Sequence, residues 1–160
     1  MLENLLAGHR LAVVVAAAQE QRQHVGALGE VGVTARAVDI TDLDQVEGAI
    51  KESGARILLA ETISNPLLKV ADVPALAALA HRNGAVLLLD NTFASPYLFN
   101  PLKHGADYVI HSATKYIAGH GDVMAGVVVT SSDNRRKLYE LNKLVGAVLG
   151  PFEAWLAMRG

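Results

Sequence analysis

Lys115 has the clearest potential for chemistry in this sequence, because it lies between two short apolar runs at residues 106–110 and 126–130. Such runs, the second rich in β-branched residues, are typical of buried strands. A lysine between buried strands is unusual, because desolvating an ammonium group is costly and favours the neutral amine. The neutral amine is the form that attacks an aldehyde to give a Schiff base. The neighbouring hydroxyl groups of Ser112 and Thr114 are suited to binding an anion carried by that aldehyde.

A carboxylate, Asp90, follows a further apolar run at residues 85–89. A cofactor of the pyridoxal type needs a carboxylate near its ring nitrogen, because negative charge there favours the protonated ring that accepts electrons. It also needs a lysine for the imine, and hydroxyl or backbone N–H groups for its phosphate. Lys115, Asp90, Ser112 and Thr114 are the residue types required. A solvated surface lysine and an aspartate that only caps a turn are the alternatives that residue types alone leave open.

The elements that must position these residues are strands that alternate with helices. Polar clusters at residues 61–65, 90–92 and 112–115 directly follow apolar runs at 56–60, 85–89 and 106–110. Alternation of strands with capped helices predicts an α/β fold, a three-layer arrangement with a mostly parallel sheet covered on both faces. Ligands of open α/β sheets bind at the carboxyl ends of the strands. We therefore expect the three clusters to meet at one edge of the sheet.

Capping signals mark the ends of the helices between these strands. Thr41 followed by Asp44 is close to a capping box, and Asp72 can cap the next helix, which Asn83-Gly84 ends in a left-handed cap. The other expected elements are strands at residues 11–18 and 33–38, a polar helix at 19–28, a helix beginning at Ser132-Asp133, and a last helix after Gly150-Pro151.

Composition excludes several classes of function. The chain has 160 residues, of which 51% are hydrophobic and 19% charged, so it can bury the core of one domain. A net charge of −2 gives no basic field for nucleic acid. The absence of cysteine excludes disulfides and a thiol nucleophile and is compatible with a cytoplasmic location. The apolar run at 11–18 is too short to cross a membrane, and Glu3 argues against a signal peptide.

A metal site is an alternative use for one group of polar residues. His104, His111 and His120 lie near Asp107 and Asp122 in the sequence. Their spacing matches no ligand pattern, and isolated histidines are usually hydrogen-bonded structural groups. We therefore expect no metal.

Three motifs occur in order along the chain: ETISNP at residues 61–66, DNTFASPY at 90–97, and HSATKY at 111–116 followed by GHGD at 119–122. Together they resemble the Cys/Met-metabolism family of pyridoxal-phosphate enzymes. This family includes cystathionine γ-synthase, cystathionine γ- and β-lyases, methionine γ-lyase and the O-acetylhomoserine sulfhydrylases. The resemblance implies the fold of the aspartate-aminotransferase type, here its large cofactor-binding domain.

The resemblance also implies roles for individual residues. Lys115 looks like the Schiff-base lysine, which in this family also moves protons between substrate carbons. Asp90 looks like the partner of the pyridine nitrogen, and Ser112 and Thr114 look like ligands of the phosphate. The remaining implied cofactor-site residues are Asn65, as donor to the phenolic oxygen of the ring, and Glu61 and Thr92, which match positions of the family motifs.

The sequence also departs from the family pattern. The glycine-containing phosphate loop and the ring-stacking aromatic residue that precede this region in the family have no counterpart before residue 11, and residues 16–29 lack a Tyr-Gly-Gly-Thr type segment. The small domain, with its arginine for the substrate carboxylate, is not found beyond Gly160. Ile63 stands where the family often has proline. We therefore expect residues 1–160 to form a partial large domain, truncated at both ends.

The resemblance implies a pyridoxal-phosphate enzyme of trans-sulfuration that catalyses β- or γ-elimination or γ-replacement. Its substrates would be small amino acids, either sulfur amino acids or activated homoserine esters, and the full-length family is homo-oligomeric. One alternative is a non-catalytic fragment or assembly module that keeps the core of the domain. An aminotransferase on the same fold is a further alternative, which the sulfur-branch motifs disfavour.

Overall fold

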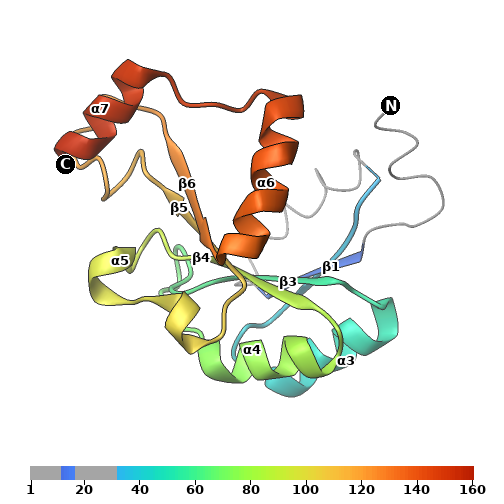
Figure 1. Cartoon of the computed structure of the whole chain (residues 1–160). Coiled ribbons are helices and arrows are strands. Elements are labelled where there is room, and N and C mark those ends of the chain that lie inside the picture. The colour runs from blue at the N-terminus through green and yellow to red at the C-terminus, as the bar shows by residue number, and fades with distance from the viewer. Residues whose placement is uncertain (1–11, 17–31) are drawn as a thin grey trace.

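The computed structural model describes residues 12–16 and 32–160, and within them a six-stranded sheet forms the centre of the molecule (Figure 1). The strands lie in the order β2-β1-β3-β4-β5-β6. The first five run parallel, and β6 pairs antiparallel with β5. Their bounds are β1 Ala12–Ala16, β2 Thr34–Val38, β3 Ile57–Glu61, β4 Val86–Asp90, β5 Tyr108–Ser112 and β6 Gly126–Thr130. The expected α/β fold with a mostly parallel sheet is confirmed.

Two helices, α3 (Leu43–Ser53) and α4 (Val73–Arg82), cover one face of the sheet (Figure 1). Both have apolar residues at helical spacing, so each buries one stripe. Val46, Ala49 and Ile50 of α3 are buried, as are Leu76, Leu79 and Ala80 of α4. They pack with alternate residues of the strands, such as Leu58, Leu87 and Val109, in one continuous core. This core holds the strands whose carboxyl ends carry the polar clusters.

The beginning of α3 differs from the expected capping box. The N-cap residue is Asp42, and its carboxylate accepts a hydrogen bond of 2.9 Å from the Gln45 N–H. The Thr41 hydroxyl instead donates to Asp39, at 2.7 Å. Aspartate competes well for the N-cap because its charge also interacts favourably with the helix dipole. The Asp72 cap of α4 is confirmed, and Gly84 after this helix has a left-handed φ of +73°.

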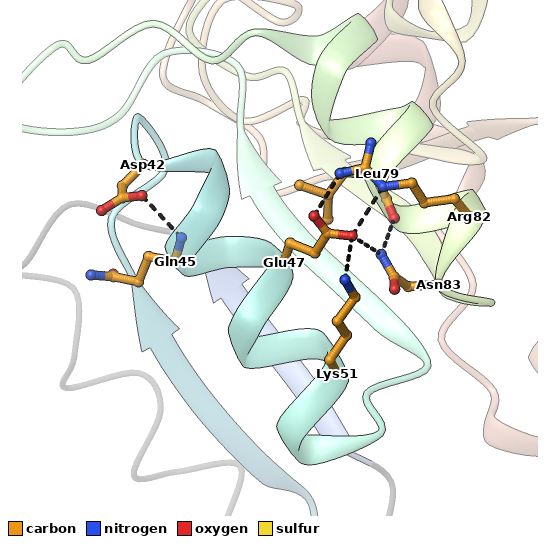
Figure 2. Close-up of polar contacts among 7 residues, drawn as sticks. All are labelled: Asp42, Gln45, Glu47, Lys51, Leu79, Arg82 and Asn83. Carbon is orange, nitrogen blue, oxygen red and sulfur yellow. Dashed lines mark hydrogen bonds and ion pairs between the residues drawn. The ribbon is translucent and has the colours of Figure 1, made fainter.

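A polar cluster between α3 and α4 joins the two helices (Figure 2). The Glu47 carboxylate accepts hydrogen bonds from Arg82 Nε at 3.1 Å and Nη2 at 2.7 Å, and it pairs with Lys51 Nζ at 2.9 Å. Asn83 Nδ2 also donates to Glu47, at 3.2 Å. These donors lower the pKa of Glu47 to about 2, with the Arg82 hydrogen bond as the largest cause. The cluster is an ionic clamp between the two helices.

The chain beyond β4 has smaller elements and an exposed end. Between β4 and β5 lie the short helix α5 (Ser95–Leu98) and the 3₁₀ helix η2 (Pro101–His104). After β6 come α6 (Ser132–Val145), on the side of the sheet away from α3 and α4 in Figure 1, and α7 (Pro151–Arg159). The expectation that β6 is buried was wrong, because residues 126–129 are exposed. In the described part of the chain, β6 is an edge strand that pairs only with β5.

Some expected elements lie outside the described residues. The helix expected at residues 19–28 is one of them, and of the strand expected at 11–18 the structure describes Ala12–Ala16. Within the described ranges, no helix is both long and apolar enough to cross a membrane.

Candidate cofactor site

The polar clusters meet at the carboxyl ends of β3, β4 and β5, as the strand pattern predicts. Glu61 ends β3 and Asp90 ends β4, and the two residues are direct partners in the register of the sheet. Asp90 is in turn opposite Ile110 of β5, two residues before Ser112. Because the strands are parallel, their ends place these side chains at one edge of the sheet.

Lys115 lies in the segment that connects β5 to β6, just past the end of β5. The segment begins as a tight turn, in which the Lys115 N–H donates to the Ser112 carbonyl at 3.1 Å and the Gly119 N–H donates to the Lys115 carbonyl at 2.9 Å. Gly119 and Gly121 have φ values of +69° and +70°, which glycine adopts without a steric cost. The expectation that Lys115 is desolvated between buried strands was wrong, since it is exposed in this structure.

A cavity of about 640 Å³ lies at this edge of the sheet. Six of the seven predicted site residues line it: Glu61, Asn65, Asp90, Thr92, Ser112 and Lys115. The remaining lining residues are Ile63, Phe93, Tyr116, Gly119 and Gly121. The cavity therefore collects an amine, two carboxylates, an amide and two hydroxyl groups from three separate segments of the chain.

Asp90, Thr92 and Ser112, which all line this cavity, are linked by hydrogen bonds. Asp90 Oδ1 accepts from the Thr92 N–H at 2.8 Å. Thr92 Oγ1 accepts from the Ser112 N–H, also at 2.8 Å. Thr92 thereby fixes the Asp90 carboxylate relative to the end of β5, which is a structural use of its hydroxyl that the motif did not reveal.

Thr114 is the predicted site residue that does not line the cavity. Its Oγ1 accepts from the Ala125 N–H at 2.9 Å and donates to the Ala125 carbonyl at 3.2 Å. The hydroxyl therefore joins the two ends of the segment between β5 and β6. For Thr114, a role as a phosphate ligand stays a prediction.

Asn65 reaches the cavity from a hairpin that follows β3. Ile63 and Val70 pair across the hairpin, and within it the Lys69 N–H donates to Ser64 Oγ at 3.0 Å. The Asn65 N–H donates to Glu61 Oε2 at 3.2 Å, so Glu61 holds the hairpin as well as lining the cavity.

Several buried polar residues directly adjoin the cavity-lining residues in the sequence. Among residues 12–16 and 32–160, the buried polar or charged residues are Thr62, Ser64, Asn91 and His111. Burial lowers the pKa of His111. The charge of Asp90 and a hydrogen bond to the Asn91 backbone partly oppose this decrease. Asn91 was missed as a site residue, although its position beside Asp90 was a signal that could have drawn attention to it.

An aromatic pair was also missed by the sequence analysis. The rings of Phe93 and Tyr116 meet edge to face, with centroids 6.0 Å apart and an interplanar angle of 63°. The pair joins the segment after Asp90 to the residue after Lys115 at the wall of the cavity. Aromatic pairs in this geometry are favourable beyond their buried area.

The histidines considered for a metal site are used in other ways. His104 stacks on Phe99 with centroids 4.7 Å apart, and His120 Nδ1 lies 2.7 Å from the Ala118 carbonyl. Among the described residues, no group of three or more histidine and acidic side chains is arranged to hold a metal ion.

Comparison with known proteins identifies relatives of this chain. The family model described as Cys/Met metabolism PLP-dependent enzyme matches residues 17–160. Cystathionine beta-lyase of Lactococcus lactis subsp. cremoris (strain MG1363) is 47% identical over 134 residues, which are 83% of this chain and 35% of the relative. L-methionine gamma-lyase of Pseudomonas putida is 45% identical over 135 residues, or 83% of this chain and 34% of the relative. The chain thus spans about a third of the length of these curated relatives.

Solved structures agree with this result. Cystathionine gamma-lyase from Lactobacillus plantarum, complexed with L-serine, is 35% identical with a TM-score of 0.84, over 99% of this chain and 43% of that one. Cystathionine gamma synthase from Xanthomonas oryzae pv. oryzae, in complex with cystathionine, is 35% identical with a TM-score of 0.85. The match covers 94% of this chain and 40% of that one. With the family model matching most of its length, the chain belongs to the Cys/Met metabolism family of PLP-dependent enzymes.

Proposed function

We propose that this chain forms the cofactor-binding part of a large domain in a PLP-dependent enzyme of trans-sulfuration. The observation that carries the proposal is the gathering of Lys115, Asp90 and Ser112 around one cavity, together with Asn65, Thr92 and Glu61. These residues come from the ends of three strands, so their meeting depends on the fold.

The donor set of the cavity fits pyridoxal 5′-phosphate, the cofactor of this family. Lys115 is the amine for its aldehyde, and Asp90 is the carboxylate for its ring nitrogen. The Ser112 hydroxyl, which has no hydrogen-bond partner among the described residues, is available to the phosphate, and Asn65 is the donor to the phenolic oxygen. Thr114 would join Ser112 as a phosphate ligand if its hydroxyl gave up the 3.2 Å hydrogen bond to Ala125.

Lys115 acts first as a nucleophile and then as a base. When bound, the cofactor supplies a ring that accepts the electron pair left on the α-carbon of an amino acid. Lys115 Nζ would hold the cofactor through its aldehyde and, when free, would be the base that takes the α-proton of the amino acid. Asp90 would hold the ring nitrogen in its protonated form through its negative charge. Exposure of Lys115 to the cavity leaves its amine accessible to both partners.

The reaction we propose is β- or γ-elimination or γ-replacement on a small sulfur amino acid or an activated homoserine ester. Support comes from relatives that are named as cystathionine lyases, a cystathionine synthase and methionine lyases. The solved relatives include complexes with L-serine and with cystathionine. We also propose a cytoplasmic location and a homo-oligomeric assembly, as expected from the family resemblance.

The proposal is tested by trapping the cofactor on the chain. The purified 160-residue chain is mixed with pyridoxal phosphate, the imine absorption is recorded, and the product is reduced with borohydride and mapped by mass spectrometry. We expect saturable labelling at Lys115 that is lost in Lys115→Ala. Lys103→Ala, which changes an exposed lysine outside the cavity, is the matched control and should leave the labelling unchanged. Labelling spread over many lysines and unaltered by Lys115→Ala would contradict the proposal.

A second candidate function is that of a non-catalytic assembly module. The observation in its favour is an apolar hollow of about 750 Å³ between β6 and α6, lined among others by Val128, Leu141 and Val145. These three side chains are 50%, 55% and 64% exposed. Exposed apolar surface of this kind is typical of a protein interface. Binding to a longer homologous chain that is lost in Leu141→Asp but kept in Leu67→Asp, a change in the hairpin after β3, would support this function.

A further inference from the structure

Asn91 is completely buried between the cavity-lining residues Asp90 and Thr92 in the chain, and its side chain makes three hydrogen bonds. Its Oδ1 accepts from the Thr62 hydroxyl at 2.7 Å, and its Nδ2 donates to the carbonyl groups of Ser95 at 3.1 Å and Phe99 at 3.0 Å. Asn91 is 0% exposed and Thr62 is 5% exposed. Both amide hydrogens are therefore used, in a place that water does not reach.

The orientation of this amide follows from its partners. Carbonyl oxygens can only accept hydrogen bonds, so the NH₂ group must face Ser95 and Phe99. The Oδ1 atom then faces Thr62, whose hydroxyl can donate. Replacing that hydroxyl with a methyl group would leave a buried acceptor without its donor, and such groups are costly in proteins.

The Thr62–Asn91 bridge extends the pairing of β3 with β4 past the last backbone partners, Glu61 and Asp90. The Thr62 N–H donates to the Asp90 carbonyl at 2.9 Å, and the Asn91 N–H donates to the Ile110 carbonyl at 2.9 Å. The peptide that follows Asp90 is thus held from both neighbouring strands. Its position sets where the Asp90 carboxylate lies relative to the cavity.

Asn91 is also hydrogen-bonded to Ser95, a residue with a strained backbone. Ser95 has a φ of +61°, which is uncommon for a residue other than glycine and persists where surrounding contacts enforce it. The Ser95 N–H donates to the Asn91 carbonyl at 2.9 Å, while the Ser95 carbonyl accepts from Asn91 Nδ2. The turn that carries Thr92 and Phe93 into the cavity is therefore closed onto Asn91.

We propose that Asn91, oriented by the Thr62 hydroxyl, is a positioning residue that fixes the Asp90 carboxylate and the Thr92 hydroxyl at the edge of the cavity. The inference rests on the proposed function in one respect, namely that Asp90 faces the ring nitrogen of the cofactor. Asn91 does not line the cavity and acts only through these neighbours.

The test uses the full 160-residue chain and two substitutions of Thr62. Thr62→Val keeps the shape of the side chain but removes the donor, and Thr62→Ser keeps the donor. Amide hydrogen exchange is measured at Thr92 and Ser112, whose N–H groups bond to Asp90 and Thr92, and is compared with exchange at Leu58 in the core. We expect exchange at Thr92 and Ser112, relative to Leu58, to be about tenfold faster in Thr62→Val, and close to wild type in Thr62→Ser.

Ile50→Val is the control for a general loss of stability, because Ile50 is buried in α3 away from the cavity. It should lower the melting temperature without making exchange at Thr92 and Ser112 faster relative to Leu58. If Thr62→Val behaves in the same way as Ile50→Val, the bridge only stabilises the fold and the inference is overturned.

A second measurement separates this inference from the proposed function. The affinity for pyridoxal phosphate is measured by titration of the imine absorption, and we expect it to be about tenfold weaker in Thr62→Val but restored in Thr62→Ser. If the wild-type chain forms no imine at Lys115, the proposed function fails for this chain, while the exchange ratios still decide whether Asn91 positions Asp90. Altered exchange with unaltered affinity would overturn the cofactor part of the inference.

Discussion

Asp39 and Lys69 form an ion pair, with Oδ2 and Nζ 2.5 Å apart, that joins the segment after β2 to the hairpin after β3. Because β1 lies between these two strands in the sheet, the pair spans the carboxyl end of β1. The hairpin that Lys69 anchors is the one that carries Asn65 to the cavity. The hydrogen bond from Lys69 and two further hydrogen bonds from Thr41 lower the pKa of Asp39 from 3.8 to about 2.

Replacing Asp39 with asparagine should reduce the free energy of unfolding at neutral pH. A lowered carboxyl pKa adds stability above the unfolded-state value of 3.8, and this contribution disappears as the pH falls toward 2. The loss in Asp39→Asn should be at most about 1 kcal/mol, because the pair is partly exposed and screened. Urea unfolding at pH 7 and at successively lower pH measures it. The two proteins should converge in acid, and a deficit that is constant with pH would contradict the assignment.

Replacing Glu47 with glutamine should loosen α3 from α4, because the clamp in Figure 2 loses its charge. Glu52→Gln in the same helix is the matched control, since Glu52 pairs with Arg36 and with no other cation of the described residues, and its side chain is 67% exposed, against 21% for Glu47. Thermal unfolding at pH 7 should show a larger decrease in melting temperature for Glu47→Gln. Because the folded-state pKa of Glu47 is about 2, the additional decrease in melting temperature of Glu47→Gln over Glu52→Gln should become smaller as the pH falls below 4.5. Equal decreases in the two variants at pH 7 would count against the clamp.

Replacing Leu156 with alanine should release α7 from the segment that carries Lys115. Leu156 is buried against Ala118 and Val123 of that segment, and Arg159 at the end of α7 pairs with Asp122. The expected loss in the free energy of unfolding is about 2 kcal/mol, at the lower end for leucine-to-alanine changes because the site is near the surface. Hydrogen exchange should also become faster in residues 118–123.

Leu144→Ala is the control for this change, because Leu144 of α6 is 77% exposed. Its effect should stay within about 0.5 kcal/mol in the same denaturant titration. A loss in Leu156→Ala no greater than this would mean that α7 does not support the segment.

Replacing Asp90 with asparagine should weaken binding of pyridoxal phosphate while keeping the fold. Asparagine can still accept the hydrogen bond from the Thr92 N–H, so the melting temperature should remain close to that of the wild type. The charge that favours the protonated ring is lost, and we expect affinity to fall by about tenfold or more. Titration of the imine absorption measures this, with Asp133→Asn, which is far more exposed, as the control. Unchanged affinity in Asp90→Asn would refute the assigned role.

Much of the fold could be predicted from the sequence because the signals are local. The spacing of Val46 and Ile50 sets the buried stripe of α3, and Asp72 caps α4 through a hydrogen bond within one turn. The strand ends at Glu61 and Asp90 follow from apolar runs that stop at a charged residue. Because these strands are parallel, even the meeting of the site residues at one edge was predictable.

Other features were decided only by the tertiary structure, because they depend on contacts between residues far apart in the chain. The sequence showed a valine-rich strand at residues 126–130, but its antiparallel pairing and exposure follow from its place at the edge of the sheet. The choice of Ala125 as partner for the Thr114 hydroxyl depends on how the segment between them closes. The sequence by itself determined which residue types gather at the site. The tertiary structure buries Thr62 and Asn91 beside the site. Because burial removes water as a competing partner, these two side chains bond to each other.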